Sequence, residues 1–251
     1  MRIAGGRWRG REVLMPKSEA VRPTQSRVRE AVFDLLMQVV GGSRFLDLFA
    51  GSGAMGLEAL SRGAASATFW ERDRAVFATL QKNLAAFGVE PTCAIQRDSL
   101  VTLGLGGDER TADKSEQSEE LCHRGQRTAR DRQPGGSGTS AAPARPSLSP
   151  SRQRPVDCRL STVDFSSSPF SIIFADPPYR WAQANGLAPL AQALCERGLL
   201  APGGFFVAEM GRTTHPEEIP GLELVRDRLY GTSRIAIWRR PADDAGAQAN
   251  G

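Results

Sequence analysis

The spacing of hydrophobic and polar residues divides the chain into helical and extended segments. Residues 22–36 place apolar side chains three and four residues apart, as one face of a helix requires, and glycines follow at 41 and 42. Residues 43–51, SRFLDLFAG, form a short apolar run that ends in a glycine-rich turn, which is typical of a buried strand. The apolar face of the predicted helix consists of Val28, Val32, Leu35 and Leu36.

Strands and helices then alternate along most of the chain. Further strands are predicted at 66–72, 92–98, 170–176, 203–210, 222–231 and 233–240. Helices are predicted at 56–63, at 73–88 and, at least in its second half, at 181–200. This alternation is typical of a mainly parallel, doubly wound α/β sheet, in which ligands bind at the carboxyl ends of the strands.

One segment interrupts the alternation. Between Cys122 and Ser147 the chain has no Leu, Ile, Val, Met, Phe, Trp or Tyr. Such a segment buries too little apolar surface to offset its ordering entropy, so we predict a disordered insertion at 105–164. The other predicted divisions are a basic arm and helix at 1–42, one α/β domain at 43–104 and 165–240, and a flexible tail at 241–251.

Positive charge is concentrated at the amino terminus. Residues 1–30 hold eight Lys or Arg against three Glu, a net charge of +5, whereas the whole chain carries +4 and the other 221 residues therefore sum to −1. A basic arm favours a polyanionic partner, with nucleic acid first, although a solvated terminus fits the composition equally well. Trp8, between Arg7 and Arg9, favours nucleic acid because an aromatic ring among arginines can stack on a base.

Cysteine and histidine are too sparse for several classes of site. The four cysteines form no CxxC pair and the chain has two histidines, which argues against a zinc site, a disulfide framework and an imidazole base. No apolar run approaches the ~20 residues that cross a bilayer, and the first residues lack the apolar core of a signal peptide. We therefore expect a cytoplasmic monomer with no metal and no membrane partner.

A glycine-rich turn follows the first strand, in the sequence LDLFAGSGAMGLEA. Glycines at 51, 53 and 56 let the backbone pass close to a ligand. The spacing is that of a dinucleotide turn, but Asp47 lies four residues before the first glycine. A carboxylate there would repel a pyrophosphate and attract an ammonium group, so the turn favours a ligand with an amino-acid moiety.

Two more carboxylates end the next two predicted strands. Glu71 is placed to accept hydrogen bonds from a ribose diol, and Asp98 from an adenine amino group. A ligand that carries an amine, a ribose and an adenine in this order is S-adenosylmethionine. The alternative is a structural turn with solvated acids at the strand ends, which three acids at successive strand ends make less plausible.

The fourth predicted strand runs into Asp176, Pro177, Pro178 and Tyr179. An ionised carboxylate is an acceptor only, so Asp176 can take one N–H of an exocyclic amine and the Pro177 carbonyl can take the other. Tyr179 offers a flat face for stacking a base, worth ~1–3 kcal/mol. The sequence resembles the [DNS]-P-P-[YFW] motif of amino-group nucleic-acid methyltransferases, which act on adenine N6, cytosine N4 or guanine N2.

Taken together, these segments resemble the bacterial small-subunit rRNA guanine-N2 methyltransferase family. The resemblance runs through MRIAGGRWRGREV, RPTQSRVREAVFDLL, the glycine turn, FADPPY and YGTSRIAIWRR, and omits about 105–164 and the tail. It implies a Rossmann-like class I methyltransferase fold, with a mainly parallel seven-stranded sheet, an antiparallel last strand and a short basic N-terminal hairpin or helix. The implied substrate is one guanine of 16S rRNA, of the guanine-966 type, in an assembling 30S subunit.

The resemblance also implies roles for individual residues. Residues 176–179 would hold the guanine. The implied cofactor-binding residues are Asp47, Phe49, Gly51, Ser52, Gly53, Glu71 and Asp98. The implied RNA-binding residues are Arg7, Trp8, Arg9, Arg22 and Arg27. Family members often have Phe where Tyr179 stands, a change compatible with stacking, and have a short turn in place of the insertion.

Three other functions are weighed against these motifs. A DNA adenine-N6 or cytosine-N4 methyltransferase has the same glycine turn and Asp-Pro-Pro motif, but no separate target-recognition domain is evident in the sequence. A non-catalytic RNA-binding assembly factor would be expected to have lost Asp176 or the cofactor acids, which are present. A small-molecule methyltransferase would not need the basic arm.

Overall fold

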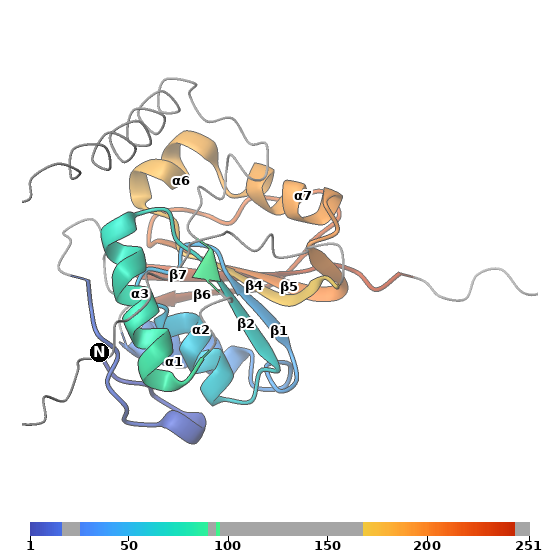
Figure 1. The fold of residues 1–251 in the computed structure, drawn as a ribbon. Helices are drawn as coiled ribbons and strands as arrows, with labels where there is room; N and C mark the ends of the chain where they lie inside the picture. Colours follow the sequence, from blue (N-terminus) through green and yellow to red (C-terminus); the bar gives the residue numbers. More distant parts are fainter. Residues whose placement is uncertain (17–25, 90–93, 96–167, 244–251) are drawn as a thin grey trace, which may run out of the picture. The chain divides into compact units, whose positions relative to one another are not determined.

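A computed structural model describes residues 1–16, 26–89, 94–95 and 168–243 (Figure 1). The described part contains a seven-stranded sheet in the order β3-β2-β1-β4-β5-β7-β6. Its strands are β1 (Arg44–Asp47), β2 (Ser66–Trp70), β3 (Ala94–Ile95), β4 (Phe170–Ala175), β5 (Leu200–Gly211), β6 (Glu223–Tyr230) and β7 (Ser233–Arg239). The predicted insertion, Arg22, Asp98 and most of the predicted tail lie outside the described residues.

The direction of the strands agrees with the fold class expected from the sequence. β1 pairs with β2 and β4, β2 with β3, and β4 with β5, all in parallel. The last strand, β7, is antiparallel to both β5 and β6. The carboxyl ends of β1, β2 and β4 therefore meet along one edge, which we call the rim.

Helices cover both faces of the sheet, as a doubly wound fold requires (Figure 1). One face carries α1 (Ser26–Leu35), α2 (Ala54–Ser61) and α3 (Arg74–Phe87). The other carries α6 (Tyr179–Asn185) and α7 (Ala188–Glu196), so that Gly186 divides the helix expected at 181–200 into two. No helix in the described ranges is long and apolar enough to span a bilayer.

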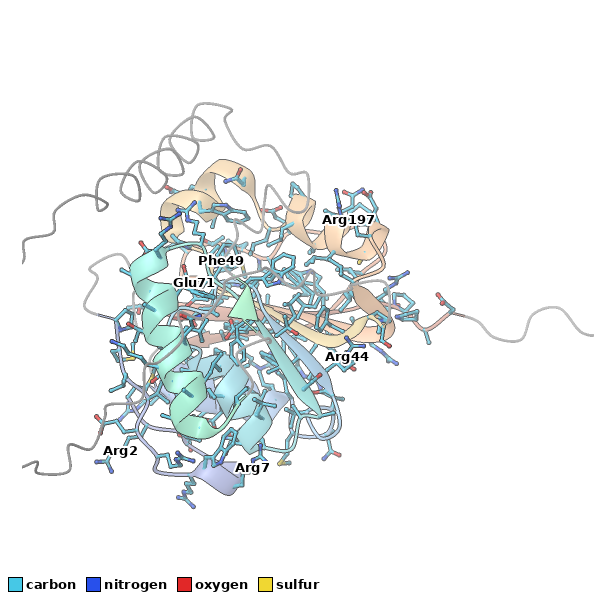
Figure 2. The ribbon with its side chains drawn as sticks, viewed as in Figure 1. Arg2, Arg7, Arg44, Phe49, Glu71 and Arg197 are labelled. Atoms are coloured by element: carbon cyan, nitrogen blue, oxygen red, sulfur yellow. The ribbon has the colours of Figure 1, made fainter. Side chains whose placement is uncertain are left out.

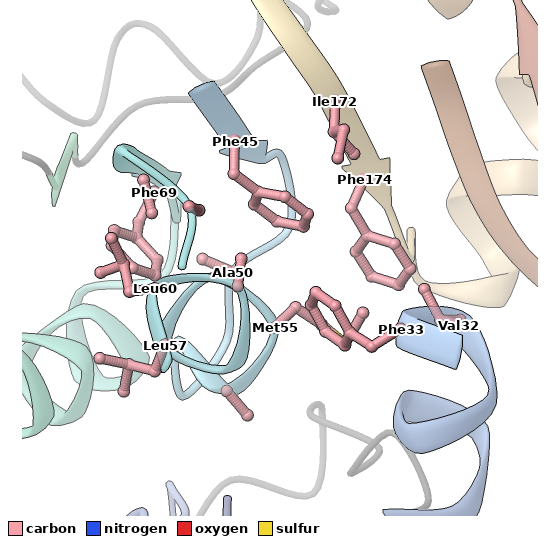
Figure 3. Packing of buried hydrophobic residues seen from close by; sticks show 14 of the residues in the cluster. Val32, Phe33, Phe45, Ala50, Met55, Leu57, Leu60, Phe69, Ile172 and Phe174 are labelled. Carbon is pink, nitrogen blue, oxygen red and sulfur yellow. The ribbon is translucent and has the colours of Figure 1, made fainter. Parts of the chain in front are cut away.

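The core beneath α1 and α2 contains phenylalanine rings among aliphatic side chains (Figure 3). Phe33 of α1 stacks on Phe45 of β1 with ring centroids 6.1 Å apart, and Phe174 of β4 lies in the same cluster. Val28, Val32 and Leu36, three of the four residues predicted to form the apolar face of this helix, are fully buried. Helical spacing thus identified the side of α1 that packs on the sheet.

The ends of α3 have local causes in the sequence. Asp73 caps its first turn, because the Asp73 carboxylate accepts hydrogen bonds from the amides of Ala75 and Val76. Gly88 ends the helix in the left-handed conformation, with a φ of 68°. The predicted helix at 73–88 is therefore confirmed, and its beginning lies directly after Glu71 on the rim.

Candidate active site

The carboxyl ends of β1 and β2 bring the glycine turn and Glu71 together. Figure 2 shows Phe49 and Glu71 at this end of the sheet, whereas Arg44, the first residue of β1, lies toward the other end. The Gly51 amide donates to Glu71 Oε2 at 2.9 Å, and the Asp73 amide donates to Glu71 Oε1 at 2.8 Å. Glu71 is thus fixed between the glycine turn and the start of α3.

The glycine turn needs its glycines for two different reasons. Gly51 and Gly53 have φ values of 55° and 81°, which favour glycine over any residue with a side chain. Gly56 lies in the first turn of α2, where a Cβ atom would be 2.2 Å from Cε1 of Phe69. The first two glycines therefore shape the turn, and the third lets α2 pack closely on β2.

Asp47 lies under this turn and is almost completely buried. Its Oδ2 atom accepts a hydrogen bond of 3.2 Å from the Gly56 amide. Burial raises the pKa of Asp47 from 3.8 to about 7; the Gly56 amide opposes this shift, and the nearby Glu71 charge adds to it. The contact gives Asp47 a role in holding the turn, and its direct contact with a cofactor amine stays a prediction.

Glu71 is half-buried, and burial also raises the pKa of its carboxyl group. The amides of Asp73 and Gly51 oppose this shift. A carboxylate has about four acceptor positions, so the two amide hydrogen bonds leave capacity for hydroxyl donors. The geometry is therefore compatible with the predicted role of Glu71 toward a ribose.

The Asp-Pro-Pro-Tyr motif forms the exit from β4 and the start of α6. The Pro178 carbonyl accepts from the amides of Trp181 and Ala182 at 2.8 and 3.0 Å, so that Pro178 begins the helix. Pro177 is buried and Asp176 is half-exposed on the rim. The two prolines thus give the backbone after Asp176 a fixed direction.

Phe49 joins this motif to the glycine turn. Its ring meets the ring of Trp181 in α6 edge to face, with centroids 5.2 Å apart. Residues 47–56 and 176–185 are far apart in the sequence, and this contact places them side by side. The structure therefore brings the predicted cofactor and target residues of the described chain to one rim.

The basic arm is a folded part of the molecule. Arg2 and Glu12 form an antiparallel bridge, and a 3₁₀ turn, η1 (Gly6–Trp8), lies between them. Ile3 and Val13 are buried in the core cluster of α1, α2 and α3. The arm thus has the hairpin form expected from the sequence.

Glu58 of α2 is the residue around which the arm is organised. Its carboxylate is fully buried and accepts from the amides of Ala4 and Gly5, each at 2.8 Å. It also accepts from Nε of Arg29 at 3.2 Å and Nε of Arg62 at 2.8 Å. Arg29 is itself fully buried and also donates to the Arg2 carbonyl.

The predicted RNA-binding residues of the arm lie at a distance from the rim. Trp8 packs edge to face on Phe87, the last residue of α3, with centroids 5.1 Å apart. The 14 residues of α3 span about 20 Å, and this helix begins at the rim. Arg7 lies 4.1 Å over the Trp8 ring, and both Arg7 and Arg9 are exposed. η1 therefore lies about the length of α3 away from the rim.

The end of the arm returns toward the glycine turn through Asn83 of α3. Asn83 Oδ1 accepts from the Leu14 amide at 2.9 Å, and Nδ2 donates to the carbonyls of Leu14 and Ser52 at 2.9 and 2.8 Å. Asn83 is buried, so these hydrogen bonds are shielded from water. One amide side chain thus connects the arm to the predicted cofactor turn.

The family model described as Conserved hypothetical protein 95 matches residues 1–113 and 156–239. The chain belongs to this family. The unmatched residues 114–155 fall within the predicted insertion, and residues 240–251 at the end of the chain are also unmatched. The resemblance inferred from the arm, the glycine turn and the Asp-Pro-Pro-Tyr motif is thereby confirmed at the level of the family.

The chain is similar to named relatives and to solved structures. Ribosomal RNA small subunit methyltransferase D of Escherichia coli (strain K12) is 58% identical over 85 residues, which are 34% of this chain and 43% of that protein. The match thus spans less than half the length of that relative. Putative rRNA methyltransferase YlbH of Bacillus subtilis (strain 168) is 27% identical over 96% of this chain and 99% of its own length. The structure of a putative methyltransferase, yhhF, from Escherichia coli has 28% identity, a TM-score of 0.62, and coverage of 96% and 98%.

The family member contains structural residues that the sequence reasoning missed. Arg29, Glu58 and Asn83 had no assigned role, although they hold the arm against α2 and α3. The position of Glu58 within the apolar run GLEAL of a predicted helix was a signal, because an acid on a buried helix needs a partner. No group of side chains among the described ranges is arranged to hold a metal ion.

Asp47 makes the stability of the protein depend on pH. Between about pH 4 and pH 7 the folded protein retains a proton that the unfolded chain has released, so stability falls as pH rises through this range. We expect the Asp47→Asn variant to lose less unfolding free energy than the wild type from pH 4 to 7, and the two curves to run parallel above pH 8. Urea unfolding at five pH values measures this, and parallel curves from pH 4 to 7 would contradict it.

Proposed function

We propose that this protein transfers a methyl group from S-adenosylmethionine to the exocyclic N2 amine of a guanine in small-subunit rRNA, in the cytoplasm and during 30S assembly. The observation that carries the proposal is the shared rim, where Phe49 of the glycine turn contacts Trp181, two residues after the Asp-Pro-Pro-Tyr motif. A nucleoside-binding turn beside an amine-binding motif is the arrangement that methyl transfer to a base requires. The name of the Escherichia coli relative, a methyltransferase of small-subunit rRNA, supports the choice of RNA.

The described residues fit S-adenosylmethionine. Gly51 and Gly53 let the backbone of the turn come close to a ligand, and Glu71 is held on the rim by the Gly51 amide. We assign the ribose hydroxyls to Glu71, the amino-acid end to the glycine turn above Asp47, and the adenine amino group to Asp98, which lies outside the described residues. When bound, the cofactor supplies an electrophilic methyl group on a sulfonium.

Asp176 would orient the target amine. Its carboxylate accepts one N2 hydrogen and the Pro177 carbonyl accepts the other, which turns the nitrogen lone pair toward the methyl donor. Transfer would form a carbon–nitrogen bond at N2 as the carbon–sulfur bond of the donor breaks, so that S-adenosylhomocysteine leaves and the extra proton on N2 passes to solvent water. Catalysis of this kind depends on positioning and electrostatics. Tyr179 is assigned the stacking face for an unstacked guanine.

A labelled-methyl assay tests the proposal directly. Purified protein and labelled S-adenosylmethionine are incubated with unmethylated 30S particles, with naked 16S rRNA and with duplex DNA. We expect label in the 30S or rRNA samples, at guanine N2 after nucleoside digestion. Label found only in DNA would establish the rival DNA methyltransferase, and no label in any substrate would favour the non-catalytic assembly factor.

The basic arm predicts a salt-dependent contribution to RNA binding. Arg7 and Arg9 are exposed on η1, so replacing both with Gln removes two phosphate contacts and should reduce the log–log salt slope of RNA binding by about 1.5. Arg197→Gln is the matched control, because Arg197 is equally exposed but lies on the other side of the molecule at the end of α7 (Figure 2). Fluorescence anisotropy at several salt concentrations measures the slopes, and an unchanged slope would count against the arm as a phosphate-binding element.

A further inference from the structure

The Asp-Pro-Pro-Tyr motif orients an amine but does not distinguish among the bases that carry one. Adenine, cytosine and guanine all present an exocyclic amine, so base choice needs another group beside Asp176. The register of β4 and β5 supplies a candidate, since Ala175 pairs with Ala208 in the last parallel pair of these strands. The next residues are Asp176 on β4 and Glu209 on β5, which places two carboxylates at neighbouring positions on the rim.

Glu209 is held in place by the hairpin that enters β7. The Ser233 hydroxyl donates to Glu209 Oε1 at 2.7 Å, and Glu209 is half-buried. Ser233 is the first residue of β7 and pairs with Gly211 at the end of β5. Arg212 fixes the turn before it, because its amide donates to the Thr232 carbonyl at 2.9 Å. The segment YGTSR thus brings a hydroxyl group to Glu209.

A second carboxylate beside Asp176 matches the edge of guanine. Guanine presents the N2 amine next to an N1–H, so its adjacent ring position is a donor. Adenine presents N6 next to an unprotonated N1, and cytosine presents N4 next to an unprotonated N3, so their adjacent positions are acceptors. If a carboxylate faces the unprotonated ring nitrogen of adenine or cytosine, two acceptors meet and neither forms a hydrogen bond. Leaving a desolvated polar group without a hydrogen bond is the strongest way in which a hydrogen-bonding site rejects a wrong ligand.

We propose that Glu209 is the residue that selects guanine: its carboxylate accepts the N1–H while Asp176 accepts an N2–H. This assignment rests on the proposed function and adds the determinant of base choice to it. The Ser233 hydroxyl fixes one oxygen of the Glu209 carboxylate and so sets the direction of this side chain.

The experiment compares RNA with guanine or 2-aminopurine at the methylated position, which is first mapped with the wild-type enzyme. 2-Aminopurine keeps the exocyclic amine but has an unprotonated N1. We expect the wild type to prefer guanine by about 10²-fold or more in kcat/KM. In Glu209→Gln the side-chain amide can donate to an unprotonated N1, so the preference should fall by at least about tenfold. 6-Thioguanine, which keeps N1–H and replaces only O6, should remain a substrate of the wild type.

Two further variants make the result specific. Glu223→Gln makes the same chemical change at an exposed position of β6 and should leave the guanine preference unchanged. Ser233→Ala keeps the Glu209 carboxylate but removes its hydroxyl partner, and should weaken the preference if Glu209→Gln does not fold. Normal wild-type transfer with an unchanged preference in Glu209→Gln and Ser233→Ala overturns the role of Glu209. Absence of transfer to any guanine by the wild type overturns the proposed function, and this assignment with it.

Discussion

Replacing Asp176 with alanine is expected to lower methyl transfer by about 10²–10³-fold while cofactor affinity stays within about threefold of the wild type. The reason is positional: Asp176 leaves β4 half-exposed on the rim, and Pro177 and Pro178 direct the chain away into α6. Alanine removes the acceptor that is proposed to orient the amine, whereas the hydrogen bond from Gly51 to Glu71 still holds the glycine turn. Single-turnover transfer to 30S particles and calorimetric titration with S-adenosylmethionine measure the two quantities separately.

Asp176→Asn is the matched control for this prediction. Asparagine also occurs at the first position of the motif in amino-group methyltransferases, and its amide oxygen can still accept one N–H. We therefore expect Asp176→Asn to retain more activity than Asp176→Ala. An equal loss of cofactor binding and of transfer in Asp176→Ala would show that Asp176 belongs to the cofactor site instead.

The strand ends were the part of the site most open to sequence reasoning. Asp47, Glu71 and Asp176 each follow a short apolar run, and in a parallel sheet the ends of such runs meet at one edge. This inference needs the type and direction of the strands but no tertiary contact. The raised pKa of Asp47 could not be inferred from the sequence, because it follows from burial under the glycine turn. That burial depends on how closely α2 packs on β2.

The arm shows where sequence reasoning reaches its limit. Trp8 suggested a base-stacking residue because its neighbours in the sequence are arginines, but its ring contacts Phe87, 79 positions later, and carries Arg7 on its face. Arg29 belongs to the basic first thirty residues of the chain, yet it is fully buried against Glu58. Charge patterns describe neighbours along the chain, and these partners come together only through the tertiary fold.

The described contacts connect the arm mechanically to the predicted cofactor turn. Glu58 and Asn83 bind the arm at its beginning and its end, and Asn83 also holds the Ser52 carbonyl. Anything that displaces residues 1–16 therefore removes a support from the glycine turn. The buried pair of Arg29 and Glu58 holds the beginning of the arm, so breaking this pair should weaken the support of the turn.

Glu58→Gln is accordingly expected to lower the free energy of unfolding by ~3–5 kcal/mol, the range for removing one partner of a buried ion pair. The variant conserves volume but leaves the buried Arg29 charge uncompensated and gives the amides of Ala4 and Gly5 a weaker acceptor. Urea unfolding measures the loss, and Glu30→Gln, on the exposed side of α1, is the control that should stay within about 0.5 kcal/mol of the wild type.

A double variant distinguishes the ion pair from the packing around it. Arg29→Met removes the charge that Glu58→Gln leaves unpaired, so the double variant should be more stable than the sum of the two single losses predicts, by at least about 1 kcal/mol. The double variant should still be less stable than the wild type, because the amides of the arm and Arg62 also donate hydrogen bonds to the Glu58 carboxylate. Strictly additive losses would show that Arg29 and Glu58 stabilise the arm independently, and a Glu58→Gln variant as stable as Glu30→Gln would remove Glu58 from the centre of the arm's structure.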